Sequence, residues 1–190
     1  GGGLHNFMDA FFKSQLHITA IELDPGIVSI ANEHFGLSES EMSLNVIVGD
    51  GLHVKSFATN SEDDENSTSS LNLRFQPSSI SLIVIDVDSK DTSVGMSCPP
   101  ISFISESYLE NLKGLLIADG GMLVINVSAR DPEKLHEVQR NVYQVFSPRS
   151  VFISSDCDNH ANDKGGRAAS SEALNVVVFA VLNTNCPNAA

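Results

Sequence analysis

The first part of this chain carries acids and glycines with the types and spacing needed to bind a nucleoside. A short apolar run at residues 18–21 leads into the acid Glu22. A carboxylate at the end of such a strand can accept hydrogen bonds from both ribose hydroxyls, about 20 residues after a glycine-rich loop. Gly1, Gly2 and Gly3 stand at that distance before Glu22. We therefore expect Glu22 to bind a ribose; the alternative is that it only caps the next helix.

Two further glycine-containing groups bear on the same site. The tripeptide Gly49-Asp50-Gly51 follows an apolar run, so its acid could accept a hydrogen bond from an adenine amino group. Gly51 would let the backbone approach the ring closely. The alternative is an ordinary turn. The N-terminal glycines point amides at a ligand if they are native, but a cloning remnant is the other interpretation.

A third acidic group could act on an amine. Asp86 follows the apolar run 81–85 and is placed to orient an amine or accept its proton. Asp88 and Asp91 would attract a cationic amine but also favour its protonated form, which cannot attack. Pro99 belongs to a stiff loop that could form a pocket wall. Cys98 lacks a neighbouring base, so a nucleophilic role is disfavoured; for Asp86 the alternative is a helix cap.

The order of elements predicts an α/β fold, a Rossmann-like parallel sheet with helices on both faces. An apolar stripe at residues 4–14, which includes Leu4, Phe7 and Phe11, predicts a helix facing the core. The apolar run 81–85 is typical of a strand buried on both faces. Further ranges predict strands at 18–23, 44–48 and 122–127, helices at 26–35, 101–117 and 132–146, and a C-terminal antiparallel hairpin at 151–155 and 175–182.

Bulk composition suits one domain over residues 1–190, with 42% apolar residues and a net charge of −13. This acidity disfavours direct nucleic-acid binding and would suit a basic partner. No apolar run approaches the roughly 20 residues that span a bilayer, so we expect no membrane segment. The acidic, polar stretch 59–77 predicts a mobile insertion. Because such a glycine loop normally follows a buried strand, we expect that the first strand is missing and the chain is N-terminally truncated.

The cysteines and histidines predict neither disulfides nor a metal site. Cys98, Cys157 and Cys186 form no CxxC pair, and no histidines stand at metal-ligand spacing. Unpaired thiols are typical of a reducing compartment, which favours a cytoplasmic location. The sequence leaves a homodimer open.

The motifs GGG, AIELDP, GDG and IDVDSKD, in that order, resemble the class I S-adenosylmethionine-dependent methyltransferases of the spermidine-synthase-like branch. The run DVDSKDTSVGMSCPP is the most specific part of this resemblance. It is similar to the methyltransferase-like proteins that modify translation elongation factor 1-alpha. The resemblance implies the cofactor S-adenosyl-L-methionine and methyl transfer to a protein amine, either the N-terminal amine or a lysine of that factor.

The resemblance also implies roles for single residues. Gly1, Gly2 and Gly3 match the loop under the methionine part and the ribose. Glu22 matches the ribose acid. Leu23 matches the residue that packs against adenine, and Asp50 and Gly51 match the pair at the adenine edge. Asp86 matches a cofactor-binding acid that accepts a proton. Asp88, Asp91 and Pro99 would line the substrate site.

Two alternatives remain at this stage. An aminopropyltransferase that makes polyamines is one, but such enzymes carry Asp-Ser-Ser-Asp-Pro where this chain has Asp86-Val87-Asp88-Ser89-Lys90. The other is a catalytically inactive module that dimerises or serves as a scaffold. Dual activity in the resembling family involves a separate N-terminal domain, so the resemblance favours the N-terminal amine over a lysine.

Overall fold

The computed structural model describes residues 3–12, 16–37, 44–56, 74–89, 91, 93–155 and 174–183. The chain divides into two units, of which the first holds Gly1–Val54 with Ser61–Leu73 and the second holds Lys55–Asn60 with Arg74–Ala190. Each unit is described by itself below. Within the described ranges, no helix has the length and apolar character to cross a membrane.

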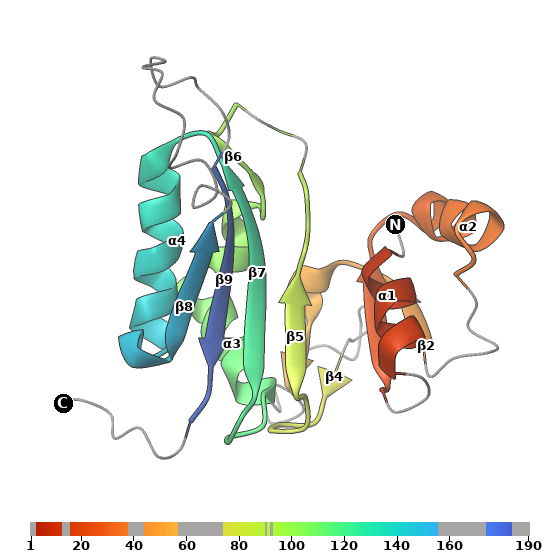
Figure 1. Cartoon of the computed structure of the whole chain (residues 1–190), viewed down its shortest axis with the longest axis horizontal. Coiled ribbons are helices and arrows are strands. Elements are labelled where there is room, and N and C mark those ends of the chain that lie inside the picture. Colours follow the sequence, from red (N-terminus) through yellow and green to blue (C-terminus); the bar gives the residue numbers. More distant parts are fainter. Residues whose placement is uncertain are drawn as a thin grey trace, which may run out of the picture. The chain divides into compact units, whose positions relative to one another are not determined.

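The first unit is built on two parallel strands, β1 and β2 (Figure 1). Its elements are α1 (Gly3–Phe12), β1 (Ile18–Glu22), α2 (Pro25–His34), β2 (Leu44–Val48) and the short 3-10 helix η1 (Gly51–His53). In the parallel register Glu22 lies opposite Val48, so both strands end at the same edge. The small core consists of Ala31, Leu37 and Leu44, with Ile18, Ala20 and Val46 packed against it.

Helix α2 begins at a well-formed cap. The side chain of Asp24 accepts a hydrogen bond from the Gly26 amide at 2.7 Å, which satisfies one of the free amides of the first turn. Pro25 occupies the first helical position, where its missing N–H costs nothing. The chain leaves the helix through Gly36, whose φ of +66° suits glycine. The predicted helix over 26–35 is therefore confirmed within one residue at each end.

The stripe of α1 is not buried, which corrects the sequence expectation. Leu4, Phe7 and Phe11 are exposed to 51%, 54% and 70%, and the rings of Phe7 and Phe11 contact each other with centroids 4.5 Å apart. Periodicity predicts that a helix has an apolar face but not what covers it. Within this unit the two-stranded sheet gives the helix little surface to cover.

The second unit is built on a five-stranded sheet with the order β5-β7-β9-β8, and β6 pairs with β7. Strands β5 and β7 are parallel, whereas β9 runs antiparallel to both β7 and β8. A separate short parallel pair joins β3 and β4. The strands are β3 (Lys55–Ser56), β4 (Arg74–Phe75), β5 (Leu82–Ile85), β6 (Met96–Cys98), β7 (Met122–Ala129), β8 (Val151–Ser155) and β9 (Leu174–Val181). The helices are η3 (Ile101–Ile104), α3 (Glu106–Leu115), α4 (Pro132–Val145) and η4 (Pro148–Ser150).

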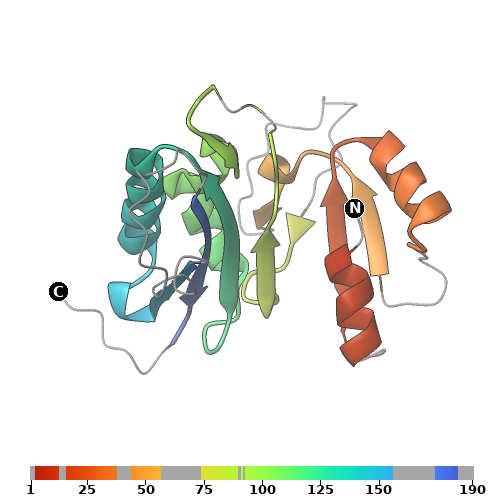
Figure 2. The ribbon, with the colours of Figure 1, turned by 45° about the horizontal axis from the view of Figure 1, so that its top comes forward.

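Strand β7 supplies the centre of this unit's core. Its residues alternate in burial, and Leu123, Ile125, Val127 and Ala129 are all fully buried. Helices α3 and α4 lie on the same side of the sheet (Figures 1 and 2). Their inward residues complete the core, namely Leu109, Leu112, Leu115, Val138, Val142 and Val145.

The hairpin, the helix 132–146 and the α/β fold class are confirmed. The predicted parallel sheet with helices on both faces differs in the second unit, where the sheet is mixed and α3 and α4 lie on the same side. Strand β9 inserts between β7 and β8, so β8 forms the edge of the sheet. The single predicted helix 101–117 is a 3-10 turn and a helix, because Ser105 adopts an extended conformation between them.

The strand over 81–85 and the predicted insertion also differ from expectation. Leu82 and Val84 remain 36% and 38% exposed, because among the described strands β5 pairs only with β7 and that face lacks a cover within the unit. Residues 59–73 of the predicted insertion lie outside the described residues, while Arg74 and Phe75 form β4.

The burial pattern of α3 predicts unequal stability costs along one helix. Leu112→Ala should lower the free energy of unfolding by about 2–5 kcal/mol, because Leu112 is buried and its truncation leaves a cavity in the core. Glu110→Ala is the matched control: its side chain is 56% exposed and pairs only weakly with Lys113 at 3.7 Å, so its cost should stay within about 0.5 kcal/mol. Urea unfolding would measure both free energies, provided that the dependence of the free energy on urea concentration is the same as in the parent. Equal losses of stability in the two variants would contradict this packing.

Candidate functional site

The carboxyl ends of β1 and β2 bring two predicted site residues to one edge of the first unit. The backbone oxygen of Glu22 accepts a hydrogen bond from the Gly49 amide at 2.9 Å, which joins the two strand ends. The Glu22 side chain accepts from the Asp24 amide through Oε1 at 3.0 Å. It therefore supports the cap residue of α2 rather than the helix itself. That bond uses one oxygen, and a carboxylate can accept further bonds through the other.

Asp50 has a comparable double role. Its Oδ1 accepts from the Leu52 amide at 2.9 Å and so caps η1, which bears out the turn interpretation. As at Glu22, the second carboxylate oxygen provides further acceptor capacity. Leu23, which directly follows Glu22, is 68% exposed, although it is a large apolar side chain.

This edge fits the nucleoside part of S-adenosylmethionine. The ribose hydroxyls and the adenine amino group are hydrogen-bond donors. The carboxylates of Glu22 and Asp50 supply acceptors for them. An adenine ring needs an apolar surface, which the exposed Leu23 supplies. Gly3 opens α1 and is exposed, whereas Gly1 and Gly2 lie outside the described residues, so the role of the glycines stays a prediction.

Asp86 is held by a partner that sequence reasoning missed. The Asn126 side chain donates from Nδ2 to Oδ1 of Asp86 at 2.8 Å. Ile85 pairs with Ile125 in the parallel register of β5 and β7, so the two polar residues that follow are neighbours across the sheet. Asp86 does not cap a helix, because the residues after it are irregular. The sequence signal for Asn126 is a polar residue that interrupts the apolar run 122–127.

The loop after Asp86 is tied to β6. Both the amide and the hydroxyl of Ser89 donate to the backbone oxygen of Ser97, at 2.9 and 3.1 Å. Asp91 is exposed, and its Oδ1 accepts from the hydroxyl and the amide of Ser93 at 2.6 and 2.9 Å. These two bonds hold the pKa of Asp91 below its ordinary value. Asp88 is exposed on the same loop. The substrate roles of Asp88 and Asp91 stay predictions that their exposure allows.

The far end of the loop requires glycine. Gly95 has a φ of +79°, and a Cβ there would lie 2.9 Å from Cβ of Asp131. Its backbone oxygen accepts from the amides of Arg130 and Asp131, at 2.8 and 3.1 Å. Asp131 in turn caps α4 by accepting from the Glu133 amide. The loop is therefore anchored to the start of a helix as well as to β6.

Cys98 is a buried thiol rather than a nucleophile. Its Sγ lies 3.3 Å from the backbone oxygen of Asn126, to which it donates. Burial, reinforced by the negative charges of Asp86 and Asp88, raises the pKa of Cys98 to about 11. Pro99 is buried beside it, so its predicted contact with substrate stays a prediction.

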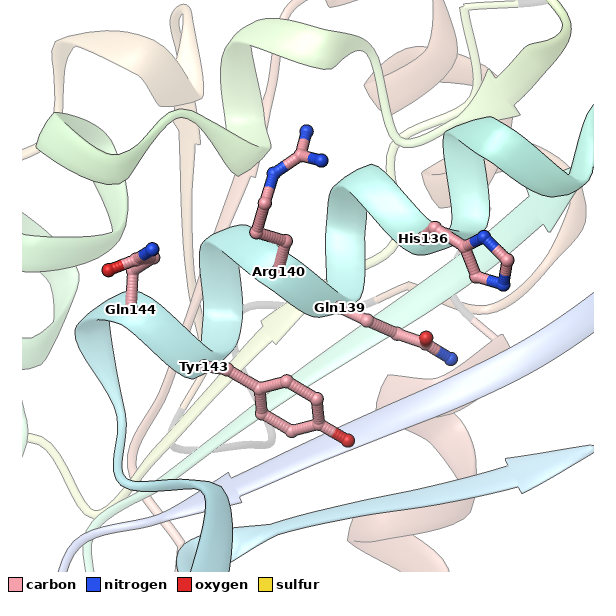
Figure 3. Close-up of a pocket in the computed structure, with 5 residues that line it drawn as sticks. All are labelled: His136, Gln139, Arg140, Tyr143 and Gln144. Atoms are coloured by element: carbon pink, nitrogen blue, oxygen red, sulfur yellow. The ribbon is translucent and has the colours of Figure 1, made fainter.

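The second unit has a surface hollow whose side chains do not form a convergent site. It runs along α4 and is lined by His136, Gln139, Arg140, Tyr143 and Gln144. Figure 3 shows that Arg140 points away from Gln139 and Tyr143, so the side chains do not converge on one point. In the part of the chain that the structure describes, no group of three or more His, Cys, Asp or Glu residues is placed to hold a metal ion.

Comparison with known proteins identifies the class to which this fold belongs, the Rossmann-like methyltransferases. A solved structure, human methyltransferase-like protein 13 in complex with SAH, matches the whole chain with a TM-score of 0.67 and 25% identity, over 72% of that protein's chain. No protein-family model matches the chain. Together with the relatives described next, this likeness shows that the chain belongs to the S-adenosylmethionine-dependent methyltransferases. The fold class and the resemblance predicted from the motifs are thereby confirmed.

Two similar curated proteins carry the same name. The chain is 32% identical over 164 residues to the "eEF1A lysine and N-terminal methyltransferase" of Xenopus laevis, which covers 86% of this chain and 21% of that protein. It is 34% identical over 132 residues to the human protein of the same name, covering 69% of this chain and 17% of that protein. The chain thus spans about a fifth of the length of these relatives.

The environment of Cys98 predicts slow alkylation in the folded protein. A pKa of about 11 instead of 9.0 leaves about 100-fold less thiolate at pH 8 than an ordinary cysteine has. Iodoacetamide labelling, followed by mass spectrometry of the Cys98 peptide, should therefore be at least about 100-fold slower in buffer than in 8 M urea. Equal rates under the two conditions would show that the thiol is neither buried nor perturbed.

Proposed function

We propose that this chain binds S-adenosyl-L-methionine and directs its methyl group to an amine of eEF1A, either the N-terminal amine or a lysine. The observation that carries the proposal is the parallel pairing of β1 with β2, which brings Glu22 and Asp50 to one edge. The names of these relatives, which specify eEF1A, support the choice of acceptor. The net charge of −13 supports a basic protein partner, since opposite charges attract over the surface.

Each residue has a stated task in this proposal. Glu22 accepts hydrogen bonds from the ribose hydroxyls, Asp50 accepts from the adenine amino group, and Leu23 packs against the ring. Asp86 orients the acceptor amine and takes up or passes on its proton. Asp88 and Asp91 attract the amine while it is still charged.

The chemistry requires little more than positioning. The bound cofactor supplies a methyl group on a positively charged sulfur, a good leaving group once a neutral amine attacks the methyl carbon. A bond forms from nitrogen to carbon, the carbon–sulfur bond breaks with its electrons going to sulfur, and the amine gives up one proton. Orientation of the amine by Asp86 therefore provides much of the acceleration.

The two acceptor amines differ in how much help they need. An α-amine has a pKa of about 7.7–8.0, so a useful fraction is neutral at the pH of a cell. A lysine, with a pKa of about 10.4, would need its proton removed against a larger cost. Asp86 is suited to the easier task, because a carboxylate is a weak base. We favour the N-terminal amine for this reason.

The proposal extends to location. Because eEF1A acts in translation, we place the protein in the cytoplasm, where Cys98 would stay a free thiol. A homodimer stays a prediction.

Loss of the Glu22 carboxylate should weaken cofactor binding. Glu22→Ala removes two charge-assisted hydrogen bonds to the ribose, so the dissociation constant for S-adenosylmethionine should rise about 10- to 100-fold. Glu33→Ala is the matched control, because Glu33 is exposed on α2 in the same unit. Isothermal titration calorimetry would measure both. Tighter binding of decarboxylated S-adenosylmethionine by the parent would favour an aminopropyltransferase, and binding of neither compound would favour a scaffold.

Loss of the Asp86 charge should slow methyl transfer by a larger factor than it weakens cofactor binding. Asp86→Asn removes the proton acceptor, so the rate of methylation of eEF1A should fall about 10²- to 10⁴-fold. Asp119→Asn, in the exposed turn before β7, is the control and should match the parent. Mass spectrometry of eEF1A would follow the rate and locate the methyl group. A fully active Asp86→Asn variant would remove Asp86 from the mechanism.

A further inference from the structure

We propose that Asn126 is the positioning residue for Asp86: its side-chain amide holds one carboxylate oxygen so that the other is presented to the acceptor amine. The proposal rests on the proposed function, because it gives Asn126 a part in the same methyl transfer. None of the motifs contains Asn126, which stands alone in an otherwise apolar stretch of β7.

The placement of the pair comes from the sheet rather than from the loop. Ile85 and Ile125 are register partners in parallel strands, and both are buried on the helix-covered side. Successive side chains along a strand point to opposite faces. Asp86 and Asn126, one residue further along, therefore meet on the other side of the sheet, and their bond of 2.8 Å joins two hydrogen-bonded strands.

The chemistry of the partner suits an acid that must be charged when the amine arrives. The Nδ2 group of asparagine can only donate, so it fixes Asp86 as the acceptor through Oδ1. Unlike a lysine or arginine, it adds no positive charge, and the carboxylate keeps its full attraction for an amine. An exposed aspartate without this bond would rotate freely about its side-chain torsions and lose orientation.

Asn126 also contacts the far end of the acidic loop. Its backbone oxygen accepts from Cys98, while its side chain donates to Asp86, so one residue bonds to both ends of the segment 86–98. Both ends of this segment are therefore hydrogen-bonded to the same residue of β7. This arrangement fixes where Asp86 lies, not only how its carboxylate is turned.

The test compares variants that change the donor at Asn126. Asn126→Asp keeps the shape but replaces the donor with a carboxylate, and Asn126→Leu removes the donor without adding charge. For a peptide with the first residues of eEF1A, kcat should fall about 10- to 100-fold in both variants, since misplacement of a reacting group has effects of that size. The dissociation constant for S-adenosylmethionine and the unfolding midpoint should stay near the parent values. Asn126→Gln, which keeps an amide on a longer stem, should recover part of kcat.

A control variant and two contrary results distinguish failure of the positioning role from failure of the proposed function. Asn175→Asp makes the same change at an exposed position of β9 and should behave as the parent. Parental kcat in both Asn126→Asp and Asn126→Leu would overturn the positioning role, as would a loss of rate that merely tracks a lower unfolding midpoint. A parent that binds the cofactor but methylates no amine of the peptide or of eEF1A would overturn the proposed function, and the positioning role with it.

Discussion

Strand β7 is the constraint on which the second unit depends, because it pairs with β5, β6 and β9. Because its side chains alternate between the two faces of the sheet, the two sets have different functions. One set of side chains, from Leu123 to Ala129, is fully buried against the helices and fixes the strand in the core. The other set contains Asn126, which bonds to Asp86. A residue with a chemical task is thus held by a strand whose alternate residues cannot move without disrupting the core.

The acids at the strand ends combine a structural bond with a free acceptor capacity. Glu22 supports Asp24, and Asp50 caps η1, each through one oxygen. The same bonds fix the direction of the carboxylate, which leaves a second oxygen at a defined place. The cap interpretation and the ligand interpretation of these acids are therefore compatible. A substitution at either position would change the local backbone as well as the ligand contacts.

Sequence patterns predicted what depends on neighbours along the chain. The strand at 44–48 has the predicted bounds, and α4 differs from the predicted helix by one residue, because turn residues and caps such as Asp131 mark these ends locally. The exposure of Phe11 and Leu82 could not be predicted, since periodicity shows that a face is apolar but not what lies against it. Asn126 was missed for the same reason, because its partner is forty residues away in sequence and only strand register brings them together.

Asp86 and Asp88 place negative charge near the loop where an amine would react, and the same charge helps to raise the pKa of Cys98. Burial contributes most, but Asp86 and Asp88 also disfavour the thiolate, so their negative charge acts at the loop. The same field attracts an ammonium group and stabilises it, which raises the amine's pKa and opposes attack. Acids near the acceptor thus help binding and hinder chemistry. The conflict is smaller for an α-amine than for a lysine, since the α-amine begins near neutral pH. An oriented Asp86 resolves the rest, because a carboxylate held by Asn126 can receive the proton at the point where the amine must lose it.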